Sequence, residues 1–142
     1  MSDLHIEFIP GDEIRIPDTS IPLTLTIVIA KYQNRTLVLY SPERQVWEAP
    51  GGGINPGETA HDCARREVLE ETSQVIDALN YKGLFKVQFD GKPEYGALFA
   101  GEIRELRPFT GNEEAERIAL VETWDELEGR INALSRTLSD YC

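Results

Sequence analysis

The chain has 142 residues, with 25 acidic against 14 basic side chains and a formal net charge of −11. This length predicts one domain, residues 1–142, that can bury a core without a disulfide or a structural metal. The acidic excess disfavours a nucleic-acid polymer or an anionic membrane as partner, because both require a basic face.

Several features predict a cytoplasmic protein. No apolar run reaches the roughly 18 residues of a membrane-spanning helix. The first residues, 1–7, carry acids where a secretory signal would carry Lys or Arg. The two cysteines, Cys63 and Cys142, make no disulfide framework, so we expect reduced thiols.

In chain order, the predicted elements follow a start in which three prolines exclude a helix. Apolar and β-branched runs predict strands at residues 23–32, 36–40, 46–49, 75–90 and 94–103. Turns are predicted between them at residues 33–35 and 90–93.

Two helices complete the prediction. Residues 59–72 contain no Pro or Gly, and Thr59 with Asp62 three residues later resembles a capping box. A second helix is predicted at 124–138, where four aliphatic residues are spaced for one apolar face: Leu127, Ile131, Leu134 and Leu138. Strands flanked by two helices, without regular βαβ alternation, predict an α/β fold with a mixed sheet packed between helices.

Glycine and glutamate gather in the middle of the chain. Gly51, Gly52, Gly53 and Gly57 lie close together beside two prolines, which predicts a tight loop that exposes backbone. In the helix that follows, a rotation of about 100° per residue places three carboxylates on one face: Glu67, Glu70 and Glu71.

Like charges on one helix face oppose each other by about 0.2–0.5 kcal/mol per pair. Arg65, Arg66, solvent or a divalent ion would relieve this repulsion. Oxygen donors without His or Cys favour Mg²⁺ or Mn²⁺, and magnesium is usually completed by substrate phosphates. The cluster therefore indicates phosphate chemistry, while a merely solvated acidic face remains the alternative.

The spacing around these acids resembles the Nudix box. Residues 52–72 read GGINPGETAHDCARREVLEET, and residues 47–51, WEAPG, resemble the entry to the loop in that family. One position departs from the family pattern, because Ser73 stands where a Gly usually ends the helix. We expect this difference to alter the exit of the helix and not the metal site.

The resemblance implies a Nudix-type α/β/α sandwich and hydrolysis of a nucleoside diphosphate linked to another moiety. The default substrate is a nucleoside triphosphate, oxidised ones included, attacked by water at phosphorus with Mg²⁺, or Mn²⁺, as cofactor. A non-catalytic nucleotide-binding or regulatory module with the same fold is the alternative. The partner would be a small nucleotide, with no nucleic-acid polymer and no membrane, and the oligomeric state stays open.

The resemblance also implies roles for individual residues. The ions would be held by the Gly51 carbonyl and three carboxylates, Glu67, Glu70 and Glu71. Glu67 is also the candidate to orient or deprotonate the water, and Arg66 with Glu58 would buttress the junction of loop and helix. One further carboxylate is expected from residues 111–116, with Glu114 ahead of Glu113 and then Glu116.

The residues that bind the rest of the substrate stay unknown at this level. Phe89 and Tyr95 are candidates for a base pocket, although core packing is the commoner use of such rings. For Trp47 packing is favoured over base stacking, and Cys63 is expected to be a small buried filler.

Overall fold

The computed structural model describes residues 6–142, so most of the acidic start at residues 1–7 lies outside the described part. In chain order the elements are β1 (Glu7–Pro10), β2 (Leu23–Tyr32), β3 (Arg35–Ser41), β4 (Val46–Glu48), β5 (Gly51–Gly53), α1 (Ala60–Thr72), β6 (Ala78–Phe89), β7 (Lys92–Glu102), β8 (Arg117–Val121), the 3₁₀ turn Trp124–Glu126 and α2 (Ala133–Ser139). Within the described residues, the helices are too short and too polar to cross a membrane.

The strands form one mixed sheet. Its main path runs β1-β6-β7-β2-β3-β4, while β5 pairs with β2 and β8 pairs with β3. In the centre β2 and β7 run parallel, from Leu23 opposite Tyr95 to Lys31 opposite Glu102. The other pairings are antiparallel.

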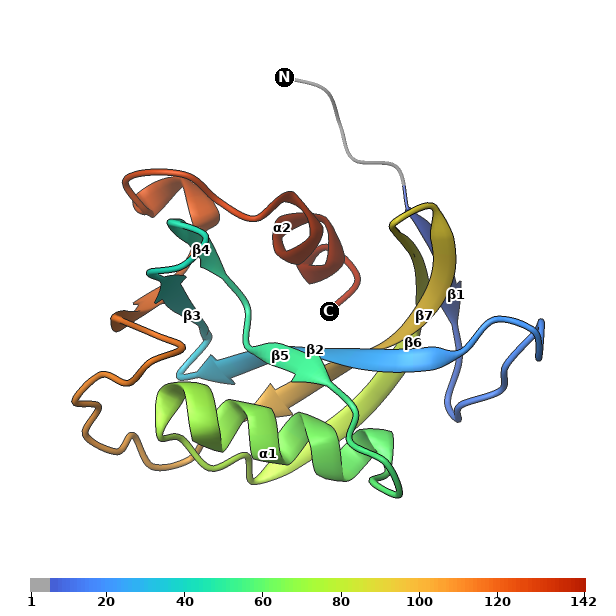
Figure 1. Cartoon of the computed structure of the whole chain (residues 1–142). Coiled ribbons are helices and arrows are strands. Elements are labelled where there is room, and N and C mark those ends of the chain that lie inside the picture. Colours follow the sequence, from blue (N-terminus) through green and yellow to red (C-terminus); the bar gives the residue numbers. More distant parts are fainter. Residues whose placement is uncertain (1–5) are drawn as a thin grey trace.

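The two faces of this sheet bury two separate cores. Along β2, Val28 and Ala30 face the core that includes Ala64 and Val68 of α1. Ile27 and Ile29 alternate with them and face the core that includes Leu138 of α2. Helices α1 and α2 therefore cover opposite faces (Figure 1). The expected α/β/α sandwich with a mixed sheet is confirmed.

The sequence predicted an element correctly where the residues that determine it lie within or next to that element. The bounds of β2 agree with the predicted strand. Helix α1 begins after Thr59, whose side chain accepts a hydrogen bond from the Asp62 N–H at 3.0 Å, as the capping motif predicted. In the predicted turn between β6 and β7, Asp90 and Gly91 both take a positive φ, which suits a two-residue hairpin.

The predicted helix at 124–138 is wrong. Gly129 takes a φ of +101° and Asn132 starts α2 as its cap, so only the last part of the segment is an α-helix. The stretch between them instead bonds to β4: the Trp47 N–H donates to the Arg130 carbonyl, and the Asn132 N–H donates to the Trp47 carbonyl. The apolar spacing was still a correct guide to burial, since all four aliphatic residues pack on the α2 side of the sheet.

Three strands were not predicted: β1, β5 and β8. The most consequential is β5, because the expected glycine loop is a strand paired with β2 from Leu25 opposite Gly53 to Ile27 opposite Gly51. A Cβ atom on Gly51 would lie 2.2 Å from the Thr26 carbonyl oxygen. Glycine is thus required for this close approach of two backbones.

Candidate active site

Helix α1 lies beside β5 (Figure 1) and carries three of the predicted carboxylates, Glu67, Glu70 and Glu71. Glu67 and Glu71 lie one turn apart and are buried, with exposed fractions of 9% and 6%, whereas Glu70 is exposed. Carboxylate oxygens of Glu67, Glu70 and Glu114 lie within 4.8 Å of one another. The structure thus brings together acids that are more than forty residues apart in sequence.

Glu71 is the most deeply buried of these acids. Its Oε1 accepts a hydrogen bond from the Gly51 N–H at 2.8 Å, and the described residues offer its side chain no cationic partner. Burial raises the pKa of Glu71 to about 8, with a further contribution from the charges of Glu67, Glu114 and Glu48. A cation is therefore needed to keep this carboxyl ionised at neutral pH.

Glu67 lies directly against the glycine strand. A Cβ atom on Gly52 would lie 2.6 Å from the Glu67 carboxyl carbon, so only glycine leaves room for this carboxylate. Burial raises the pKa of Glu67, and the hydrogen bond from Arg66 opposes that rise. The shape of β5 and the position of Glu67 are thus matched to each other.

Arg66 connects the helix to the preceding loop. Its Nε and Nη2 donate to the two oxygens of Glu58 at 2.7 and 2.9 Å, and its Nη1 donates to Glu67 and Glu70 at 2.9 and 3.1 Å. The guanidinium of Arg66 lowers the pKa of Glu58 to about 2. Arg65 points elsewhere and donates to the Ile76 carbonyl.

Asn112 holds the loop that carries Glu114. Its Nδ2 donates to the carbonyls of Glu70 and Glu71 at 3.1 and 3.2 Å, while its Oδ1 accepts from the N–H groups of Glu114 and Ala115. Sequence reasoning missed this residue. The signal available was the Gly111-Asn112 pair, which is typical of a turn but says nothing about what the side chain bonds.

The donor set suits a hard divalent cation. Carboxylate oxygens from α1 and from the loop at 111–116 converge on one place, with no His or Cys ligand among them. The raised pKa of Glu71 is consistent with a site that binds a cation. These oxygen donors favour Mg²⁺ or Mn²⁺.

A cavity of about 280 Å³ borders the same glycine strand. It is lined by residues of β2, by Gly51 and Gly52, by Arg44 and Glu48, by the start of α2 and by the half-exposed ring of Phe89. Tyr95, the other candidate for a base pocket, is 3% exposed and packs in the core on the α1 side.

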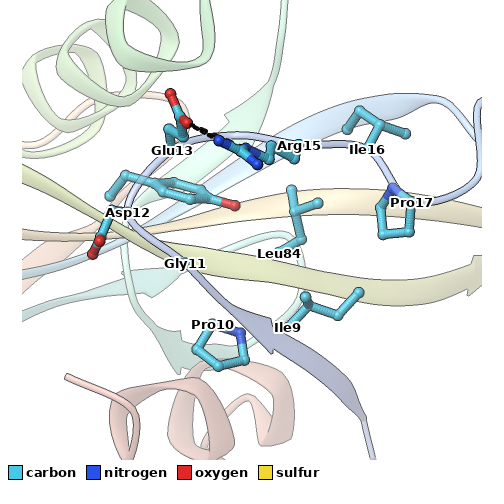
Figure 2. A pocket seen from close by; sticks show the side chains of 10 residues that line it. Ile9, Pro10, Gly11, Asp12, Glu13, Arg15, Ile16, Pro17 and Leu84 are labelled. Atoms are coloured by element: carbon cyan, nitrogen blue, oxygen red, sulfur yellow. Dashed lines mark hydrogen bonds and ion pairs between the residues drawn. The ribbon is translucent and has the colours of Figure 1, made fainter.

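A larger cavity, of about 530 Å³, lies at the β1 edge of the sheet. Figure 2 shows the ion pair of Glu13 and Arg15 on one side of it and Ile9 and Pro10 on the other. Strands β6, β7 and β2 separate this edge from β5. None of the converging carboxylates lines this cavity.

Two further residues adopt the packing roles that were expected. Cys63 is fully buried, with its Sγ 3.4 Å from the Gly53 carbonyl oxygen and 3.3 Å from the Thr26 hydroxyl. Trp47 is 5% exposed, and its indole N–H donates to the Glu128 carbonyl. Both stabilise the frame around β4 and β5.

The protein is thus an α/β/α sandwich in which the carboxylates of helix α1 lie beside the glycine strand β5. The NUDIX domain model matches residues 23–139, which is most of the chain. The chain therefore belongs to the Nudix family, and the resemblance in the sequence is confirmed.

Curated relatives share the central part of the chain. The oxidized purine nucleoside triphosphate hydrolase of Mus musculus is 42% identical over 48 residues, which is 34% of this chain and 31% of that protein. The putative 8-oxo-dGTP diphosphatase YtkD of Bacillus subtilis is 33% identical over 79 residues, 56% of this chain and 49% of that one. The chain thus spans about a third to a half of the length of these relatives.

Solved structures share the whole fold. The pyrophosphohydrolase BsRppH of Bacillus subtilis superposes with a TM-score of 0.77 at 21% identity, over 96% of this chain and 86% of that one. A NUDIX hydrolase from Nitrosomonas europaea gives a TM-score of 0.72 at 19% identity, over 84% and 87% of the two chains. At these identities the likeness establishes the fold alone.

Proposed function

We propose that this protein is a divalent-metal-dependent hydrolase that cleaves a nucleoside diphosphate linked to another moiety. The observation that carries the proposal is the buried Glu71 carboxylate, which lies beside Glu67 and forms no ion pair within residues 6–142. Such a group is costly in a resting protein unless a cation binds there. A bound divalent ion would neutralise diphosphate oxygens and increase the acidity of a water molecule.

Each residue of the site has a part in this proposal. The ions are held by the Gly51 carbonyl and by four carboxylates: Glu67, Glu70, Glu71 and Glu114. Glu67 orients the attacking water and accepts its proton, for which its burial and raised pKa are suitable. Arg66 and Glu58 act as positioning residues, because their paired hydrogen bonds fix the start of α1 against the loop.

The substrate we propose is a nucleoside triphosphate, with oxidised purine nucleotides as the leading group. The names of the relatives from Mus musculus and Bacillus subtilis support this choice. The cavity beside β5 supports it independently, since it offers a place for a base next to the carboxylates. Mg²⁺ is the proposed cofactor, with Mn²⁺ as a substitute.

The proposed partner is a small nucleotide and not a nucleic-acid polymer. The net charge of −11 supports this choice, because a polyphosphate of a few charges can be bound through cations at one site whereas a polymer needs an extended basic face. A cytoplasmic location and a single domain over residues 1–142 are part of the same proposal.

The experiment that tests this function is a panel of nucleotides scored by kcat/KM with and without Mg²⁺. We expect release of pyrophosphate or phosphate from nucleoside triphosphates only when the metal is present. Tight nucleotide binding without turnover across the whole panel would instead identify a binding or regulatory module.

A further inference from the structure

The cavity beside β5 contains a charged pair of its own. Arg44 and Glu48 both line it, and an Arg44 Nη2 donates to Oε1 of Glu48. The cavity also shares Gly51 and Gly52 with the carboxylate site, where these residues contact Glu71 and Glu67. A nucleotide whose phosphates lie at the carboxylates therefore has this cavity beside it for its base.

Glu48 has an acceptor that the protein does not use. The residue is 7% exposed, yet its Oε2 receives no hydrogen bond from the described residues. No fully buried side-chain oxygen in the described part of the chain lacks a partner, so Oε2 must be accessible to solvent. Because Glu48 lines the cavity, an accessible carboxylate oxygen is offered to whatever binds there.

An ionised carboxylate only accepts hydrogen bonds, so it selects a ligand edge that carries donors. Among the bases, guanine presents two adjacent donors, N1–H and the N2 amino group. Adenine and cytosine present one amino donor next to a ring acceptor, and uracil or thymine presents one imino donor between two carbonyls. Oxidation of guanine at C8 leaves the two-donor edge unchanged.

We propose that Glu48 selects guanine nucleotides, oxidised or not, by accepting hydrogen bonds from the N1–H and N2–H donors of the base. Phe89, 49% exposed at the same cavity, supplies a ring on which the base stacks. Arg44 is a positioning residue that donates to Oε1 of this carboxylate and leaves Oε2 for the base. This inference rests on the proposed function, because the phosphates must lie at the carboxylates for the base to reach Glu48.

The test compares the base preference of four proteins: the parent, Glu48→Gln, Arg44→Gln and the matched control Glu13→Gln, which removes an exposed ion pair far from the site. For each, kcat/KM is measured with dGTP, 8-oxo-dGTP, dATP and dCTP in Mg²⁺. We expect the ratio of dGTP to dATP to fall about 10–100-fold in Glu48→Gln, because an amide keeps one acceptor and turns an N–H toward the guanine donors.

Arg44→Gln breaks the same ion pair but keeps the carboxylate, so its ratio of dGTP to dATP should fall less than that of Glu48→Gln. A fall in Arg44→Gln as large as in Glu48→Gln would overturn the assignment of selection to the Glu48 carboxylate. Glu13→Gln should keep the parental ratio. If kcat/KM fell equally for all bases in Glu48→Gln, Glu48 would act on the neighbouring Glu71 and not on the base. That result would overturn the inference but leave the proposed hydrolase function unaffected. A parent that does not prefer guanine would overturn it as well.

Binding separates this inference from the proposed function. Calorimetric titration with dGMP and dAMP in Mg²⁺ needs no turnover, because a nucleoside monophosphate contains no phosphoanhydride to cleave. Tighter binding of dGMP that Glu48→Gln abolishes would support the inference even if no nucleotide were hydrolysed. Equal binding of both nucleotides, or binding of neither, would overturn it.

Discussion

At the scale of single residues, the acids of the site differ in how their charge is balanced. Arg66 donates to Glu67 and Glu70 but not to Glu71, whose side chain accepts a hydrogen bond only from the Gly51 N–H in the part of the chain that the structure describes. Glu71, the most deeply buried of these acids, is therefore the residue whose charge most requires a cation. Burial, followed by the charges of Glu114 and Glu70, raises the pKa of Glu67, whereas Arg66 opposes this rise.

Glu67→Gln should abolish most of the activity. The amide cannot accept a proton from water and is a weaker metal ligand, so we expect kcat to fall by about 10²–10⁴-fold on a proven substrate. Circular dichroism should show an unchanged fold, because Gln has nearly the same shape beside Gly52.

The matched control is Glu102→Gln, an exposed glutamate at the end of β7. It should retain parental turnover. If Glu67→Gln hydrolysed the substrate at the parental rate, the role that we give to Glu67 would be wrong.

At the scale of elements, helix α1 is fixed at both ends by different devices. Thr59 caps its start, and Asn112 bonds the carbonyls of Glu70 and Glu71 near its end. The residue that follows the helix, Ser73, takes a left-handed conformation with φ of 65°, and its N–H donates to the Leu69 carbonyl. The family departure at this position is therefore a local strain and leaves the carboxylate face in place.

Ser73→Gly should stabilise the protein. A left-handed residue other than Gly costs about 1–2 kcal/mol, and the greater freedom of Gly in the unfolded chain offsets about 0.4–1 kcal/mol of the gain. We expect the free energy of unfolding in urea to rise by about 0.5–1 kcal/mol. Ser73→Ala keeps the strain and is the control; an equal rise in both variants would contradict this explanation.

Asn112→Ala should weaken metal binding through Glu114. The variant loses the bonds that hold the loop on α1, so we expect the apparent Mg²⁺ affinity in activity assays to fall about 10–100-fold. If Asn112 acts by positioning Glu114, the double variant with Glu114→Gln should be no worse than Glu114→Gln alone. Additive losses would indicate an independent role.

The sequence predicted those elements whose structure is determined by residues close together in the chain. Thr59, the uninterrupted helix after it and the Asp90-Gly91 turn act over a few residues, and their bounds were nearly correct. The segment at 124–138 failed because hydrogen bonds to Trp47, far away in sequence, override its helical spacing. Strands β1, β5 and β8 were missed for a related reason, since each is defined by its partner strand.

The residues of the site also fall into two groups, those that local spacing predicts and those that only the fold brings to the site. The helix face predicted Glu67, Glu70 and Glu71 as one group because their spacing is local. The structure adds two parts that long-range packing places at the site: the pair of Glu48 with Arg44 at the cavity beside β5, and the tether at Asn112. Glu48 and Arg44 lie four residues apart, but only the fold places them beside Gly51 and Gly52, and only the fold brings Asn112 to the end of α1.

At the scale of the whole molecule, the charge of −11 includes acids whose ionisation opposes folding. The pKa of Glu71 is about 8 in the folded chain, against about 4.3 in the unfolded chain. Between these values the folded state binds more protons than the unfolded state. Stability without metal should therefore decrease as pH rises through this interval, and should level off above pH 8.

This effect predicts a pH-dependent response to metal. In EDTA we expect Tm to fall from about pH 5 to about pH 8, and we expect the rise in Tm on adding Mg²⁺ to grow over the same interval, because the ion binds the ionised form. Glu71→Gln should flatten both trends. Parallel Tm curves for the parent and this variant, measured by circular dichroism, would exclude Glu71 as the cause.

The parallel pairing of β2 with β7 has a consequence for how the protein is made. Leu23 pairs with Tyr95, so roughly seventy residues must be synthesised between the two halves of the central sheet. Helix α1, at 60–72, is synthesised before β7, and a chain that ends after α1 contains the complete motif without the strand that completes the sheet beneath it. Contacts between such distant segments form slowly. The arrangement of oxygens for the metal therefore belongs to a late stage of folding, and the motif would not bind metal in the same way as an isolated peptide.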